Sequence, residues 1–166
     1  MKEIDQKTYI FGAIFILANR LQILGDRLDE NVTVKQWSLM AIISKCEHTA
    51  PTLSEVAEMI GSSRQNVKKM ALILENQGFV TLNKDTIDAR IIRLSLTPKC
   101  MKYFQTRAHK EQEFIENLYQ GFGNDLINGL YVGVTKLAQN IVKMEHENEK
   151  QEIIIHSITF ISCNSW

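Results

Sequence analysis

The apolar positions between Leu53 and Leu72 are spaced as in two short amphipathic helices that cross at a tight turn. The side chains expected to face inward are Val56, Ala57, Ile60, Gly61, Val67 and Met70. Ala57 is small enough for a second helix to pack over it, and Gly61 can adopt the positive φ that such a turn requires. This pattern predicts a helix-turn-helix.

Two strand patterns follow this helix pair. Gly78 is expected to end the second helix, and residues 79–82 are typical of a short strand. A polar segment from Asn83 to Asp88 separates it from residues 90–96, in which apolar and polar positions alternate. A helix pair followed by a β-hairpin predicts a winged helix-turn-helix.

Threonines mark three helix starts. Thr33 is suited to cap a helix over residues 34–46, and Thr52 with Glu55 forms a capping-box pattern before the first helix of the motif. Thr97 precedes Pro98, which is favoured at the first position of a helix. A helix is therefore expected from residue 98 to about 119.

Long apolar stripes flank the central region. At helical spacing, the first stripe contains Ile10, Ile14, Leu17, Leu21, Leu24 and Leu28, and the second Leu126, Leu130, Val134, Leu137, Ile141 and Met144. A domain of this size cannot bury so much apolar surface alone, so we expect a homodimer joined through these helices.

The predicted fold class is thus mainly α with a small β-hairpin wing. The expected division of the chain is 1–30 and 98–145 as dimerisation helices, 31–97 as a winged helix-turn-helix DNA-binding domain, and 146–166 as a C-terminal extension of unknown role.

Composition fits a globular protein whose charge is segregated. The chain has 166 residues, 45% of them apolar, and a formal net charge of zero. From Ser62 to Lys99 there are seven basic and three acidic residues, so 7 minus 3 gives +4. From Glu111 to Glu152, three lysines and eight acidic residues give −5. The positive excess falls on the predicted motif, as a DNA-binding surface would require.

The first twenty residues are apolar but do not fit a secretory leader. Glu3 and Asp5 interrupt its positive start, and Asn19 with Arg20 break the apolar run before it reaches the roughly 18 to 20 residues that cross a bilayer. Three cysteines without paired spacing argue against a disulfide framework. We expect a cytoplasmic protein that has no membrane partner and reduced cysteines.

The outward residues of the motif have the chemistry of DNA contacts. Arg64 suits guanine, Gln65 and Asn66 suit adenine, and Ser62, Ser63, Lys68 and Lys69 suit phosphates. In the wing, Arg90 is expected to enter a minor groove while Asp88 holds its guanidinium, and Arg93 joins the same set. The alternative for each residue is an ordinary solvated surface.

Over roughly Ile4 to Met144 the chain resembles the MarR family of bacterial transcription regulators. The wing carries the resemblance, with Asp85, Asp88, Arg90, Arg93, Leu94, Leu96, Thr97 and Lys99 at the spacing of the family pattern. Cys100 replaces a usual glycine, and Leu82-Asn83 replace a common basic pair. The resemblance implies a dimeric repressor that binds a roughly palindromic operator of double-stranded DNA. It would release the operator when a small-molecule effector binds in a crevice. The residues that could line this crevice are Trp37, Tyr103, Arg107 and His109.

Three other functions stay open. Cys100, in the first turn of a helix, is favoured as a buried unreactive thiol, and the alternative is a reactive thiolate in a redox-responsive regulator. His109 and Glu113, with Cys46, Glu47 and His48, could form a metal site, but the histidine spacing is unfavourable. A winged helix can also serve as a protein-interaction module without DNA. No sequence motif indicates an enzyme or a bound cofactor.

Overall fold

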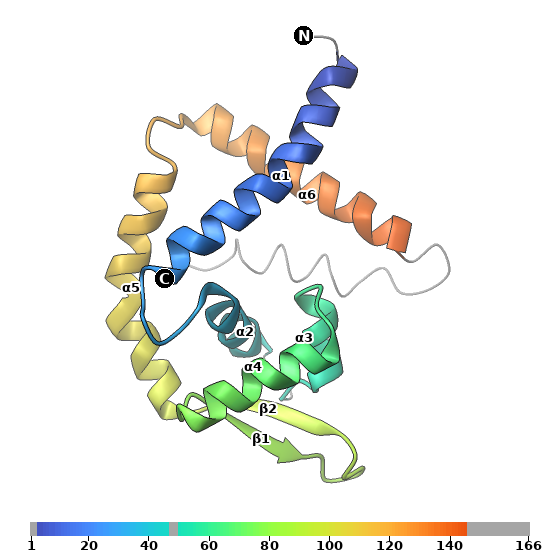
Figure 1. Cartoon of the computed structure of the whole chain (residues 1–166), viewed down its shortest axis with the longest axis vertical. Helices are drawn as coiled ribbons and strands as arrows, with labels where there is room; N and C mark the ends of the chain where they lie inside the picture. The colour runs from blue at the N-terminus through green and yellow to red at the C-terminus, as the bar shows by residue number, and fades with distance from the viewer. Residues whose placement is uncertain (1–2, 47–49, 146–166) are drawn as a thin grey trace. The chain divides into compact units, whose positions relative to one another are not determined.

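The computed structural model describes residues 3–46 and 50–145, so the predicted extension at 146–166 and Cys163 lie outside the described residues. Its elements, in chain order, are α1 (Glu3–Asp26), α2 (Val34–Lys45), α3 (Leu53–Met59), α4 (Arg64–Asn76), β1 (Val80–Lys84), β2 (Ile92–Leu96), α5 (Pro98–Leu118) and α6 (Asn124–Glu145) (Figure 1). The predicted class, mainly helical with a β-hairpin wing, is confirmed.

The chain divides into two compact units, Met1–Ser38 and Leu39–Trp166. In the first unit, the carboxylate of Asp26 accepts the N–H of Val34 at 2.7 Å, which ties the end of α1 to the start of α2. Thr33 and Gln36 exchange hydrogen bonds between each side chain and the other's N–H, at 3.3 and 2.9 Å, so Thr33 begins α2 as expected. The division falls inside α2, and the domain bounds expected from the sequence stay a prediction.

Helix α1 is long and strongly apolar. By length and composition it could cross a membrane, since Ile4–Asp26 spans 23 residues with a window of mean hydropathy 1.4. No uninterrupted apolar run reaches this length, as expected, but Asn19 and Arg20 interrupt the run without ending the helix. Its large side chains from Ile4 to Leu24 are mostly exposed.

The reading head, residues 50–97, contains α3, α4 and the hairpin, and it is built on a small apolar core. Val56, Ala57 and Val67 are buried as predicted, while Ile60 and Met70 are half-buried. Gly61 lies at the surface with φ 62° and reverses the chain between the two helices. The predicted helix-turn-helix is thus present.

The hairpin packs against both helices of the motif. β1 and β2 pair antiparallel, with Val80 opposite Leu96 and Lys84 opposite Ile92, so β1 extends two residues beyond its predicted end. Leu94 is buried, and its N–H donates to the carbonyl of Pro51 at 2.8 Å. The extended residues Pro51 and Thr52, just before α3, therefore pair with β2 through a short β-bridge.

The last two helices differ in what they bury. Helix α5 begins at Thr97, whose hydroxyl accepts the N–H of Cys100, with Pro98 in the first turn as predicted. Its buried positions are Cys100, Arg107 and Glu111, whereas Ile115 and other apolar residues near its end are exposed. Along α6, every member of the predicted stripe is exposed, from 38% at Leu137 to 80% at Met144.

Candidate nucleic-acid interface

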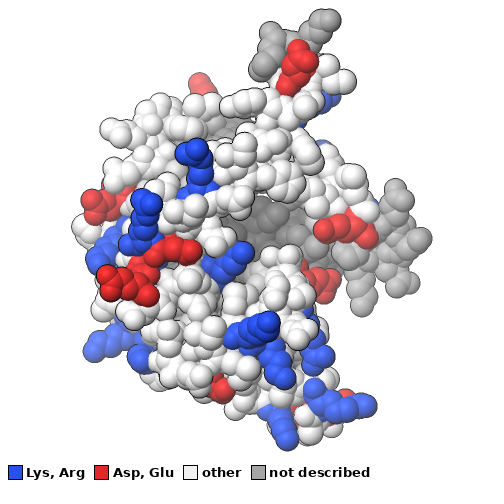
Figure 2. Space-filling view, in the orientation of Figure 1, with Lys and Arg blue, Asp and Glu red and all other residues white. Residues whose placement is uncertain are grey.

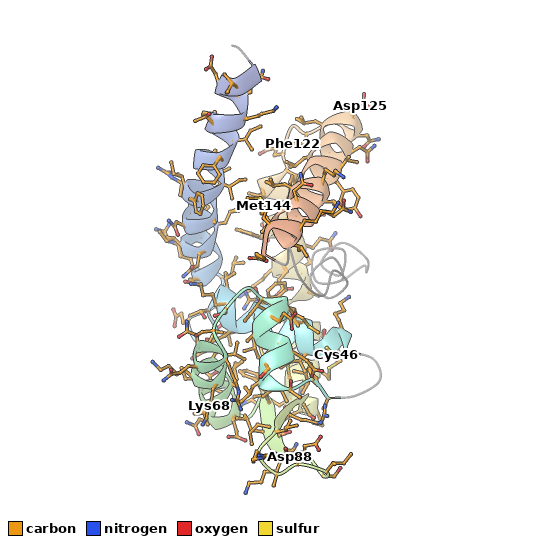
Figure 3. The ribbon with its side chains drawn as sticks, turned by 90° about the vertical axis from the view of Figure 1, so that its right-hand side faces the viewer. Cys46, Lys68, Asp88, Phe122, Asp125 and Met144 are labelled. Atoms are coloured by element: carbon orange, nitrogen blue, oxygen red, sulfur yellow. The ribbon has the colours of Figure 1, made fainter. Side chains whose placement is uncertain are left out.

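Helix α4 separates an apolar face from a polar one. Val67, Ala71 and Leu74 are buried. The residues left exposed are Arg64, Gln65, Asn66, Lys68 and Lys69, all of them predicted DNA contacts. Lys68 projects outward from the helix (Figure 3). One side of α4 therefore presents amide and cationic groups together.

Ser62 and Ser63, the two serines before α4, both make hydrogen bonds that stabilise the start of this helix. The hydroxyl of Ser63 accepts the N–H of Asn66 at 3.2 Å and caps the helix. Ser62 is half-buried, and its N–H donates to the carbonyl of Ala57 at 2.9 Å. The first turn of α4 is consequently fixed at the end where Arg64 and Gln65 emerge.

At the wing tip, Asp88 holds Arg90. The guanidinium donates from Nε and Nη2 to the two carboxylate oxygens at 3.0 and 2.8 Å, and the N–H of Arg90 donates to the same carboxylate at 3.0 Å. These bonds lower the pKa of Asp88 and raise that of Arg90. Because the arginine side chain is 90% exposed, the pair orients its charge without burying it.

At the wing base, Arg93 turns inward. Its guanidinium bonds to the Asp85 carboxylate, and Nη1 donates to the carbonyl of Ala50 at 2.8 Å. Together with N–H groups of the loop, Arg93 lowers the pKa of Asp85 to about 2. This brace joins the wing to the segment before α3, so Arg93 supports the scaffold of the wing, and its predicted DNA contact stays a prediction.

Three residues that the sequence reading did not single out for this role also fasten the wing. The ammonium of Lys99 donates to the carbonyl of Gln77 at 2.6 Å and lies 5.0 Å from the ring centre of Phe79. The Thr97 hydroxyl donates to the carbonyl of Gly78 at 2.7 Å, and Glu75 accepts the N–H of Leu82 at 3.0 Å. The end of α4, both strands and the start of α5 therefore form one support.

The predicted effector residues fall in different places. On α5, Arg107 is buried, its Nε lies 2.7 Å from Glu111, and another of its nitrogens bonds to the Tyr103 hydroxyl. His109 is exposed, and two residues along a helix turn it about 200° from Arg107. Trp37 lies half-buried on α2, in the first unit.

Cys100 is the buried thiol that the sequence favoured over a reactive thiolate. The side chain is fully buried, its sulfur lies 3.5 Å from that of Met40, and burial raises the pKa of the thiol to about 11. Desolvation thus outweighs the helix dipole. Burial and the Glu55 carboxylate also raise the pKa of Cys46.

The metal hypothesis gains no support from the described residues. Glu47 and His48 lie outside them, and residues 3–46 and 50–145 contain no group of three potential ligands.

Positive charge gathers on the reading head. Figure 2 shows lysine and arginine side chains over α4 and the hairpin. Because Arg90 and Arg93 are paired with Asp88 and Asp85, the excess comes mainly from Arg64, Lys68 and Lys69 on α4, all exposed. The sign of this surface suits a polyanion.

No model of a known protein family matches the sequence, and no curated protein matches it. Several solved protein structures are similar to the structure of this chain. A MarR protein from Peptoclostridium difficile is 20% identical, with 80% of this chain covering 86% of that one at a TM-score of 0.70. MepR of S. aureus, in complex with DNA, is 15% identical, with coverage of 81% and 97% and a TM-score of 0.70. An organohalide-sensing transcriptional regulator in its 2,4-dichlorophenol-bound form is 14% identical, with coverage of 89% and 90% and a TM-score of 0.74. The chain therefore has the winged helix-turn-helix fold of the MarR-family transcriptional regulators.

Proposed function

We propose that this chain is a sequence-specific regulator of transcription that binds double-stranded DNA as a homodimer. The observation that carries the proposal is the exposed polar and cationic face of α4, beside a wing whose Arg90 is held outward by Asp88. The MepR complex with DNA supports it by likeness of fold.

In this proposal α4 enters the major groove. Arg64, Gln65 and Asn66 lie in its first turn, where a recognition helix reads base edges. Lys68 and Lys69 contact phosphates and set the register. Arg90 reaches the adjacent minor groove, where negative potential attracts a cation. A second copy reads an equivalent half-site roughly 34 Å along the duplex.

The homodimer forms through the end helices. Eleven large apolar side chains of α1 and nine of α6 are exposed in the single chain. Monomeric proteins in water rarely leave contiguous apolar surface of that extent uncovered. We assign both helices to the dimer interface, which makes α1 a packing element of a cytoplasmic protein and not a membrane span.

The proposed regulation of DNA binding is by a small effector. We propose a repressor that leaves its operator when a small effector binds near Tyr103 and Arg107. The support is the similar organohalide sensor, whose structure holds 2,4-dichlorophenol. His109 is left out of this set because it is exposed on the opposite side of α5 from Arg107.

The experiment is selection from a randomised duplex library, followed by titration of the enriched sequence at several salt concentrations. Lys68→Gln and Lys69→Gln should each reduce the slope of log affinity against log salt by about one. Lys136→Gln, an exposed charge on α6, is the matched control and should leave the slope unchanged. Failure of the wild-type protein to enrich any sequence would contradict the proposal and favour an interaction module.

A further inference from the structure

The wing tip exposes one large apolar side chain. Ile87 is 96% exposed, more than any other large apolar residue among those that the structure describes. A single exposed isoleucine is ordinary on a protein surface. Here its position matters, because it lies in the loop between β1 and β2, three residues before Arg90.

The backbone around Ile87 is held firmly. The Asp85 carboxylate accepts the N–H of Ile87 at 2.8 Å and that of Asp88 at 3.1 Å. The N–H of Asp85 donates to the carbonyl of Ile91 at 2.9 Å, and the N–H of Ile91 donates to the carbonyl of Asp88 at the same distance. Because Arg93 in turn fixes Asp85, the tip is pre-ordered before it meets any partner.

This tip projects beyond the helices of the reading head. Figure 1 shows the loop extending past α3 and α4, and Figure 3 places Asp88 at its far end. An apolar side chain and an exposed guanidinium thus occupy the same short projection. If Arg90 enters a groove of the DNA, Ile87 is therefore brought to the same groove.

The small size of the exposed wing tip favours DNA over a protein as the partner of Ile87. A stable protein interface buries on the order of 1,000 Å² or more, which one isoleucine on a narrow loop cannot approach. The minor groove is only about 6 Å wide, and there single apolar side chains act as wedges that partly unstack one base step. The cost of that unstacking depends on sequence, and it is lowest at flexible pyrimidine–purine steps.

We propose that Ile87 is a minor-groove wedge that makes each wing sensitive to the deformability of the base step beside the half-site. This inference rests on the proposed function, because it requires Arg90 to bring the wing into the groove. It assigns to the chain a specificity that comes from shape, in addition to the base-edge contacts of α4.

The test compares wild-type protein, Ile87→Ala and Thr86→Ala in parallel selections from a randomised duplex library. Thr86 is the matched control because it is the neighbouring exposed residue of the same loop. Wild type and Thr86→Ala should enrich a TA or CA/TG step outside each half-site. Ile87→Ala should keep the α4-dependent positions and lose that step, with about tenfold weaker binding to the wild-type consensus, as one disfavoured position costs.

A second readout places 2-aminopurine at the enriched step. Its fluorescence should rise when wild-type protein binds, because the base becomes unstacked, and should stay low with Ile87→Ala. Equal enrichment and equal fluorescence for Ile87→Ala and wild type would overturn the inference while leaving the proposed function intact. If wild type enriches no sequence, the proposed function itself fails, and the two outcomes are therefore distinct.

Discussion

At the scale of single residues, Arg90 is the sharpest test of the wing. Its side chain is 90% exposed and touches the fold through Asp88, so Arg90→Ala should leave the circular dichroism spectrum and melting temperature unchanged. Loss of its minor-groove contact should weaken operator binding about tenfold or more. The check is a titration at physiological salt beside Lys136→Ala. Unchanged affinity would remove the wing from the mechanism.

Asp85 carries a pH-dependent part of stability. Hydrogen bonds, first from Arg93 and then from the N–H groups of Ile87 and Asp88, lower its pKa from 3.8 to about 2. A lowered folded-state pKa means that the stabilisation is complete above about pH 4 and is lost as the pH falls toward 2.

Asp85→Asn should therefore be less stable than wild type at pH 7, and the gap should narrow between about pH 4 and 2. Urea unfolding over a pH series measures both proteins. A gap that stays constant with pH would show that the charge of Asp85 does not stabilise the wing.

Residues whose role depends on near neighbours were predictable from the sequence. Thr52 and Glu55 form their capping box within one turn, and Gly61 has the positive φ expected of it. The bracing role of Arg93 was not predicted, because its acceptor on Ala50 is 43 residues away. For Cys100 the sequence favoured burial but left a reactive thiolate open, because its contact with Met40 depends on packing between distant helices.

At the scale of elements, Gly61 determines how α3 meets α4. Its φ is 62°, and a Cβ there would meet nothing within 4 Å, so a substitution is penalised through the backbone alone. Gly61→Ala should lower the free energy of unfolding by about 1 kcal/mol. Gly61→Asn should lose less, since asparagine tolerates this conformation. Equal stability of all three proteins in urea unfolding would contradict this view of the turn.

The sequence predicted where elements begin better than which faces they bury. Helix starts at Thr52 and Thr97 are local and were confirmed. The inner face of α5 buries the Arg107–Glu111 pair, because an ion pair can replace apolar packing where both partners are buried together. The short β-bridge before α3 was not predicted, since it depends on pairing with β2.

At the scale of the whole molecule, the apolar stripe of α6 implies a partner. Leu137 is 38% exposed in the single chain, and Leu137→Glu should shift dimer toward monomer by placing a charge in the interface. Asn140→Glu, at an exposed polar position of the same helix, is the control. Sedimentation velocity at micromolar concentration measures both, and a dimer unaffected by Leu137→Glu would exclude this face of α6. Recovery of the full-length protein in the membrane fraction would instead make α1 a membrane span.

In the proposed complex, two copies present their positive reading heads to one duplex. The decisive measurement is the mass of the complex in sedimentation equilibrium with a selected duplex near physiological salt. We predict two chains per duplex, with affinity that falls steeply as salt rises. A chain that remains monomeric at micromolar concentration and shows no preference for any duplex would contradict the claim.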